Sequence, residues 1–234
     1  GGCLNMNLYI WNDMDEDARE NLLRRSEKHI SELESAIRPV VDEVRDRGDR
    51  AVAEFTREFD GVSLKASQFR VKKKEFAEAE KKLPAKIKKA IEKAAANVRA
   101  YHEKQMPEPF WLTPVEEGVY AGEKITPVAS CALYVPRGKG SFPSVMIMLG
   151  VPACVAGVKK LVVVTPPGPK GEADAATLVA ASACGIDEIY RVGGAQAIAA
   201  LAFGTARIPK VDKIVGPGSG YVTAAKRLLY GQVD

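Results

Sequence analysis

The stretch ALYVPRGKGSFPSVMIMLGVPACVAGVKKLVVV, residues 132–164, decides the fold class of this chain. It reads as an apolar strand, a loop with two glycines, an apolar helix and a second apolar strand. The pattern continues with strands expected at 161–164, 186–190 and 214–215, each followed by a loop and a helix. Because parallel strands need crossover connections, these four units predict an α/β fold with a parallel four-stranded sheet. The uninterrupted apolar strands indicate a sheet that is buried on both faces.

The chain before this sheet is predicted to be mainly helical. Apolar residues recur there at helical spacing, and the turn dipeptide Asp60-Gly61 separates two groups of helices. Phe69–Val71 reads as a short strand, and the proline-rich PEPFWLTPVEEG reads as a connector. We therefore expect three parts: a helical N-terminal region (1–112), a connector with a short strand (113–129) and the sheet domain (130–234).

The composition is that of an ordinary globular protein, with 46% hydrophobic and 27% charged residues among 234. No apolar run approaches the roughly 18–20 residues that span a bilayer. No charged segment followed by an apolar core opens the chain as a signal peptide would. We expect a soluble, cytoplasmic protein with no membrane partner.

The cysteines and histidines give little support for a metal site. Cys3, Cys131, Cys154 and Cys184 form no C-x-x-C pair, so free thiols are favoured over a zinc or disulfide role. The two histidines, His29 and His102, lie far apart on charged helical stretches. A zinc site or a histidine base built from this chain alone is therefore not expected.

Residues 72–104 are strongly basic, with eleven Lys or Arg and five Glu. Such a stretch can bind nucleic acid, or it can be the solvated face of helices. Ile87, Ala90, Ile91 and Ala94 mark an apolar stripe at helical spacing, and no aromatic residues alternate with the lysines. The solvated face is the favoured interpretation, and we expect no nucleic-acid partner.

Glycine-containing loops follow all four predicted strands, at 136–141, 165–171, 193–194 and 216–220. The first three loops contain no acidic residue before the predicted start of the helix that follows. Glycine lets the backbone approach a ligand closely, and free helix N-termini attract phosphate. GPGSG matches neither common nucleotide motif, so tight turns remain the alternative for that loop alone. Four such loops at one sheet edge favour a dinucleotide or another phosphate-bearing ligand.

Several segments resemble histidinol dehydrogenase. The most specific is RVGGAQAIAALAFGT (191–205), followed by IPKVDKIVGPG (208–218) and YVTAAKR (221–227). PVASCALYVPRG, MLGVPACVAGVKK and the N-terminal RGD with AVAEFTREFD also fit, so the resemblance runs nearly end to end. It implies a zinc-dependent, NAD-dependent enzyme that oxidises L-histidinol to L-histidine, a small-molecule substrate. It also implies a homodimer whose subunits each contain two incomplete Rossmann-like domains, of which residues 130–234 correspond to the NAD-binding one.

The resemblance places three NAD-contacting positions on this sequence. The Tyr of the family's L-Y-[IV]-P segment falls on Tyr134, and the Gln of V-G-G-A-Q falls on Gln196. The third position, usually Asn in G-P-G-N, is Ser219 here. Arg137 also departs from the Gly-Gly that commonly follows the proline of the first loop, where Lys139 adds a second positive charge.

The family's zinc ligands and its Glu-His acid/base pair fall after the segment equivalent to Val233–Asp234. We therefore assign no catalytic and no metal residue, and we expect these 234 residues to be inactive alone. We also expect apolar surface to be exposed in residues 1–112, where it would favour dimerisation or instability. Two alternatives remain: a related dehydrogenase for another small alcohol, and a stand-alone nucleotide-binding module without catalysis.

Overall fold

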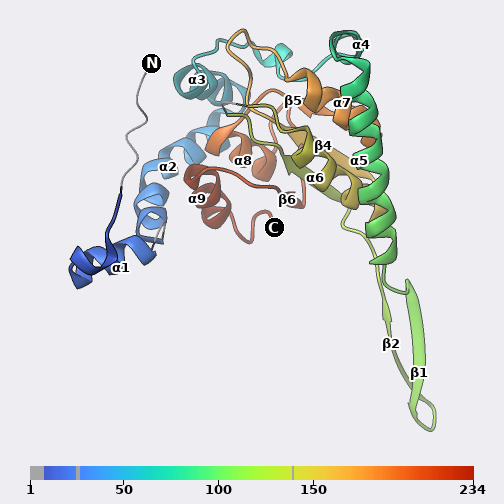
Figure 1. The fold of residues 1–234 in the computed structure, drawn as a ribbon. Coiled ribbons are helices and arrows are strands. Elements are labelled where there is room, and N and C mark those ends of the chain that lie inside the picture. The colour runs from blue at the N-terminus through green and yellow to red at the C-terminus, as the bar shows by residue number, and fades with distance from the viewer. Residues whose placement is uncertain (1–7, 25–26, 139) are drawn as a thin grey trace.

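The computed structural model describes residues 8–24, 27–138 and 140–234, and its α/β fold is built on a four-stranded parallel sheet (Figure 1). The strand order is β5-β4-β3-β6, and each neighbouring pair is parallel. The strands are β3 (Ser130–Tyr134), β4 (Lys160–Val164), β5 (Ile189–Tyr190) and β6 (Lys213–Val215). The predicted parallel sheet is confirmed, and β3 is buried along its whole length.

The order of the strands creates a switch point in the sheet. Ala132 of β3 pairs with Val162 of β4 on one side and with Ile214 of β6 on the other. The chain passes from β3 to β4 and β5 in one direction, and then crosses to β6 on the opposite side of β3. The carboxyl ends of β3 and β6 therefore flank the place where open α/β sheets bind ligands.

Helices cover both faces of the sheet. They are α6 (Pro143–Val155) and α7 (Ala175–Cys184) on one face, and α8 (Gly194–Phe203) and α9 (Gly220–Leu228) on the other. Since side chains alternate along a strand, Ala132 and Tyr134 face α8 and α9 whereas Cys131 and Leu133 face α6 and α7. Within the described ranges, no helix combines the length and apolar character needed to cross a membrane.

Helices from the first half of the chain form an outer layer on each face (Figure 1). They are α2 (Glu27–Arg47) and α3 (Asp49–Asp60) against α8 and α9, and α4 (Lys73–Lys82) and α5 (Ala85–Lys104) against α6 and α7. Ile37, Val44 and Val52 are buried in the first of these interfaces, and Ile91 and Ala95 in the second. The expected exposure of apolar surface is confirmed only in part for these helices. Their inward faces pack on helices of the same chain, whereas Phe59, Ile87 and Tyr101 are exposed.

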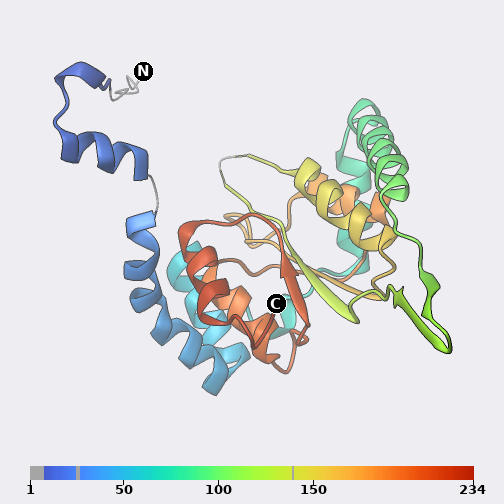
Figure 2. The same ribbon diagram turned by 90° about the horizontal axis from the view of Figure 1, so that it is seen from below.

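Apolar side chains are also exposed, as expected, in two parts that project from the main body. α1 (Glu16–Arg24) and the short 3-10 turn Trp11–Asp13 before it lie away from the main body (Figure 2). Trp11, Leu22 and Leu23 are exposed there. The second part is a hairpin that follows α5.

The hairpin consists of β1 (Phe110–Glu116) and β2 (Val119–Lys124), paired antiparallel and projecting from the body (Figure 1). The sequence predicted a proline-rich connector over most of this stretch, and the structure shows paired strands instead. Gly118 takes a positive φ of 77° in the turn, which a residue with a side chain adopts only under strain. Pro114 is accommodated because an isolated hairpin has only edge strands, where a missing N–H can face solvent.

The N-terminal half also contacts the edge of the sheet directly. Residues 69–71 run beside β5, where the Val71 N–H donates to the Ile189 carbonyl and the Arg191 N–H donates to the Phe69 carbonyl, each at 2.8 Å. The predicted strand over Phe69–Val71 is thus a single antiparallel bridge, between Arg70 and Tyr190.

The Arg191 side chain fixes this junction. It is 8% exposed, and its guanidinium lies 2.6 Å from the Glu75 carboxylate of α4. Its Nε also donates to the Gln68 carbonyl at 3.1 Å. A buried cation that satisfies both a carboxylate and a carbonyl ties the outer layer of helices to the end of β5.

We expect Arg191→Met to lower the free energy of unfolding by about 3–5 kcal/mol, because it leaves the mostly buried Glu75 carboxylate without its cation. Urea unfolding followed by circular dichroism measures this change. The matched control is Arg50→Met, since Arg50 is 80% exposed in its pair with Glu54 and should contribute less than about 1 kcal/mol. Equal losses for the two variants would contradict this role for Arg191.

Candidate functional site

The loops at the carboxyl ends of the strands form the candidate site. The described loop residues are 135–138 and 140–142 after β3, 165–174 after β4, 191–193 after β5 and 216–219 after β6. Each leads into the N-terminus of a helix, whose first N–H groups lack partners within the helix. Three of these four helices begin without a side-chain cap. The edge is therefore suited to an anionic ligand.

Tyr134, the last residue of β3, lies at the centre of this edge. Its hydroxyl accepts a hydrogen bond of 3.0 Å from the N–H of Gly194, the first residue of α8. The loop after β6 also comes close, because a Cβ on Gly216 would overlap the Tyr134 carbonyl oxygen. Burial raises the pKa of the Tyr134 hydroxyl, which is neutral at physiological pH. Tyr134 thus joins the third and fourth loops at the switch point.

Gln196, in the first turn of α8, is completely buried, and neither its amide nitrogen nor its amide oxygen has a hydrogen-bond partner. Its side chain folds back over Gly194, where any side chain would collide with it. Leaving such a group unpaired costs about 1–3 kcal/mol for each buried donor or acceptor. The unpaired amide makes Gln196 a candidate ligand contact at this edge.

Ser219 stands immediately before α9 and is exposed, and its side chain caps none of the N–H groups of that helix. The loop is held from behind by Lys226, whose ammonium donates to the Gly216 carbonyl at 2.9 Å. Burial lowers the pKa of Lys226. The structure brings Tyr134 and Gln196 to the same helix start, while Ser219 lies on the neighbouring loop.

The second loop differs from the prediction. The sequence suggested a helix from Glu172, which left the loop without acidic residues, but α7 begins at Ala175. Asp174 caps it, and its Oδ2 accepts hydrogen bonds from the Thr177 N–H at 2.8 Å and the Ser141 hydroxyl at 2.6 Å. Asp is a preferred N-cap residue, so the helix starts after it. The N-terminus of α7 already holds a carboxylate, and we exclude it as a phosphate site.

Arg137 connects the first loop to the second. Its guanidinium donates to the Glu172 carbonyl and lies against the Glu172 carboxylate, both at 2.8 Å. The residue that departs from the family pattern therefore stabilises the loops. Lys139, expected to add charge here, lies outside the described residues.

Asp60 is a member of this edge that the sequence did not reveal. It ends α3, and its Oδ2 is buried without a hydrogen-bond partner. Burial raises its pKa to about 6, and its charge contributes to raising the pKa of Tyr134. Asp60 lines a cavity of about 340 Å³ together with Arg137 and a wall of proline and glycine residues. In the sequence Asp60-Gly61 looks only like a turn, because its contacts come from loops more than seventy residues later.

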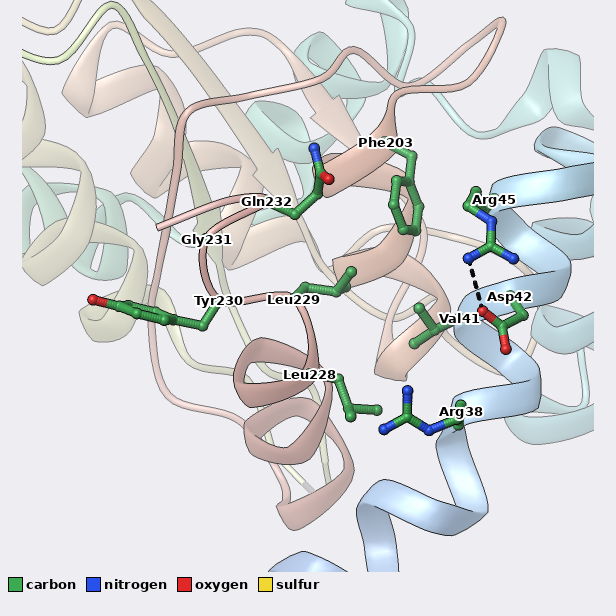
Figure 3. Close-up of a pocket in the computed structure, with 10 residues that line it drawn as sticks. All are labelled: Arg38, Val41, Asp42, Arg45, Phe203, Leu228, Leu229, Tyr230, Gly231 and Gln232. Carbon is green, nitrogen blue, oxygen red and sulfur yellow. Dashed lines mark ion pairs between the residues drawn. The ribbon is translucent and has the colours of Figure 1, made fainter.

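A second cavity, of about 400 Å³, lies between α2 and residues 228–232 (Figure 3). Arg45 and Asp42 form an ion pair of 3.0 Å at its border. Its walls come from the C-terminal ends of α8 and α9, and thus from the edge opposite the candidate site. Of the segments singled out in the sequence, only 191–205 reaches it, through Phe203.

The structure places the other candidate metal-binding residues apart from this edge. Cys131 and Cys184 are buried and Cys154 is half-buried, each as a free thiol, and His102 lies near the end of α5. Cys3 and the side chain of His29 lie outside the described residues. Among the residues that the structure describes, no group of three His, Cys, Asp or Glu is arranged to hold a metal ion.

A family model described as histidinol dehydrogenase matches residues 23–234, almost the whole chain. The chain belongs to the histidinol dehydrogenase family. A histidinol dehydrogenase of Synechocystis sp. is 50% identical over 213 residues, which are 91% of this chain and 49% of that protein. A histidinol dehydrogenase homolog of Rhizobium meliloti is 46% identical over 98% of this chain and 50% of its own length. The chain spans about half the length of the curated relatives it matches.

The fold comparison agrees with this assignment. The crystal structure of histidinol dehydrogenase from Elizabethkingia anophelis matches with a TM-score of 0.81 and 34% identity. The match covers 86% of this chain and 46% of that one. The helical layers and the parallel sheet described above are therefore features shared with a histidinol dehydrogenase.

The raised pKa of Asp60 predicts a distinct pH dependence of stability. Because the folded-state pKa is about 6, the folded protein binds more protons than the unfolded chain between about pH 4 and pH 6. The stability that this group contributes is present at low pH and is lost as the pH rises. Relative to wild type, Asp60→Asn should gain about 1–2 kcal/mol in free energy of unfolding from pH 4 to pH 7, after allowance for solvent screening.

Urea titrations at several pH values measure this difference. Glu58→Gln is the matched control, since it changes the same charge at an exposed position on the same helix and should leave the pH profile unchanged. Parallel profiles for wild type and Asp60→Asn would show that Asp60 is not held in a poorly solvated site.

Proposed function

We propose that this chain binds NAD at the carboxyl edge of its sheet, as the cofactor-binding part of an enzyme that oxidises L-histidinol to L-histidine. The observation that carries the proposal is the buried, unpaired amide of Gln196 at the start of α8, beside Tyr134. Family membership supports the reaction, and the position of the edge at the switch point supports a dinucleotide ligand. The complete reaction is proposed for the longer proteins that this chain matches over about half their length.

The residues at this edge fit NAD in a specific way. Apart from the Gly194 N–H, which donates to Tyr134, the first N–H groups of α8 and α9 would be offered to the pyrophosphate. Gln196 would offer a donor and an acceptor. Tyr134 holds the start of α8 in place through its hydroxyl and gives the site an aromatic wall. When bound, NAD would accept a hydride from the alcohol carbon. Ser219, shorter than the Asn usual in the family, would offer one hydroxyl to the ligand.

Zinc takes no part in what we derive for these residues. The described residues offer no group of His, Cys, Asp or Glu arranged for a metal, so no step is assigned to a metal ion here. We propose that zinc binding and proton transfer depend on the part of the longer relatives that lies outside the match. We also propose a cytoplasmic homodimer, in which the exposed apolar residues of α1 and the hairpin contact the partner subunit.

The substrate has a second candidate. The relatives named histidinol dehydrogenase and histidinol dehydrogenase homolog are similarly close to this chain, at 50% and 46% identity. A different small alcohol is therefore the alternative substrate for the longer protein. A non-catalytic nucleotide-binding module is the alternative for this chain.

We expect isothermal titration calorimetry to detect NAD binding to these 234 residues, and spectrophotometry to detect no NADH when histidinol and zinc are added. A DNA duplex titrated at two salt concentrations serves as the control ligand, since binding to phosphate backbones weakens steeply with salt. Turnover well above the blank would contradict the proposal that these 234 residues bind NAD without catalysing the reaction. Duplex binding in place of NAD binding would contradict the proposed ligand.

Gln196→Leu separates a ligand-binding amide from a structural one. The substitution removes two unpaired polar atoms at similar volume, so the free energy of unfolding without ligand should stay equal or rise by about 1 kcal/mol. The affinity for NAD should fall at least about tenfold, as expected for the loss of one or two hydrogen bonds.

Chemical denaturation and calorimetry measure the two quantities on the same variant. Gln105→Leu is the matched control, because Gln105 is exposed at the end of α5 and far from the edge. A Gln196→Leu variant that is destabilised yet binds NAD normally would contradict the assignment.

A further inference from the structure

One oxygen of the Asp60 carboxylate, Oδ2, is a buried acceptor without a donor. This oxygen is shielded from solvent and accepts no hydrogen bond, although the residue lines a cavity of about 340 Å³. A buried carboxyl oxygen is normally paired with an N–H, an O–H or a cation. The raised pKa, about 6, follows from this burial and leaves Asp60 mostly ionised at neutral pH. Among the described residues, none forms an ion pair or a hydrogen bond with the Oδ2 atom of Asp60 in this cavity.

The position of Asp60 is fixed by the ends of α3. At its start, the Thr205 hydroxyl donates a hydrogen bond to the Asp49 carboxylate. At its end, Gly61 takes the left-handed conformation, with φ of 68°, which stops the helix immediately after Asp60. The carboxylate is therefore held at the sheet edge by a rigid element and not by a mobile loop.

The side chains of the other described residues around the cavity supply no donor to Asp60 Oδ2. They consist of Gly61, Gly138 and residues 166–169, which are prolines and a glycine and carry no polar side chain. Arg137 also lines the cavity, but its two terminal nitrogens are bonded to Glu172 at 2.8 Å. Hydroxyl groups of a ligand would satisfy Asp60 without displacing either partner of that ion pair.

We propose that Asp60 determines which dinucleotide binds, by accepting hydrogen bonds from the ribose hydroxyls of NAD and repelling the 2′-phosphate of NADP. The inference rests on the proposed NAD-binding function of the same edge. An acidic residue paired with a ribose diol is the common way in which dinucleotide-binding sheets favour NAD. Here the acid comes from a helix of the N-terminal half and reaches the loops after β3 and β4 from outside the sheet domain.

Arg137 offers the opposing interaction. A guanidinium in the same cavity can bind a 2′-phosphate, and it would do so if it exchanged its bonds to Glu172 for the ligand. Because Arg137 is already bonded to Glu172 and Asp60 Oδ2 lacks a donor, the cavity favours the ribose diol of NAD over the 2′-phosphate of NADP. The relative affinity for the two dinucleotides distinguishes these outcomes.

The test compares the dissociation constants of NAD and NADP, measured by calorimetry at pH 7.5, for wild type, Asp60→Asn and Asp60→Ala. Wild type should prefer NAD, and each variant should bind NAD about 10- to 100-fold more weakly, the effect of losing hydrogen bonds to a charged group. The preference for NAD over NADP should largely disappear in both variants. Asp60→Asn is isosteric and removes an unpaired charge, so it should remain folded in circular dichroism.

Glu58→Gln is the matched control, since it removes one negative charge two residues away at an exposed position and should leave both constants unchanged. If wild type binds NAD and the Asp60 variants still prefer NAD over NADP to the same extent, this inference is overturned and the proposed function stays intact. Wild type that prefers NADP would overturn it in favour of Arg137. Binding of neither dinucleotide to wild type would overturn the proposed function, and this inference with it.

Discussion

A sheet that is apolar on both faces must be covered on both faces, and the rest of this structure follows from that constraint. The helices that connect the strands provide a first layer, α6 and α7 on one side and α8 and α9 on the other. Of these, α6, α7 and α8 are apolar nearly all round and α9 has one apolar face, so they need cover in turn. The N-terminal half supplies it, with α2 and α3 on one face and α4 and α5 on the other. The buried pair of Arg191 and Glu75 locks this outer layer to the edge of the sheet.

In the same arrangement, the buried polar atoms without hydrogen-bond partners lie at one edge of the sheet. Helix starts, glycine turns and the ends of strands meet there. The buried amide atoms of Gln196 and the buried Oδ2 atom of Asp60 have no hydrogen-bond partner. Elsewhere in the described residues, buried polar groups such as Thr56 and Ser130 are hydrogen-bonded within the chain. Proteins tolerate unsatisfied groups mainly where function requires them. The edge is therefore better suited to a ligand than to the stability of the chain by itself, and NAD is the ligand that we propose.

The sheet domain could be predicted from sequence because each of its strand–loop–helix units has a recognisable local sequence pattern. An apolar strand, a glycine turn and an apolar helix lie within about 30 residues, and the repeats leave one topology class. The N-terminal cover could not be predicted in the same way, since the amphipathic pattern of α2 shows that it packs but not on what. The hairpin was missed because its prolines suggested a connector, and the start of α7 was misplaced because Asp174 caps the helix. Tyr134 and Gln196 were found through a resemblance, whereas Asp60 became visible only through long-range contacts.

The most direct test of this account is hydrogen–deuterium exchange of the 234-residue chain with and without saturating NAD. We predict slower amide exchange at residues 193–198 and 216–223, at the starts of α8 and α9, and at residues 58–62 around Asp60. The hairpin over residues 110–124 should exchange equally in both states. Protection confined to the basic helices over residues 72–104, or unchanged exchange at the sheet edge under saturation, would contradict the assignment of this edge as the cofactor site.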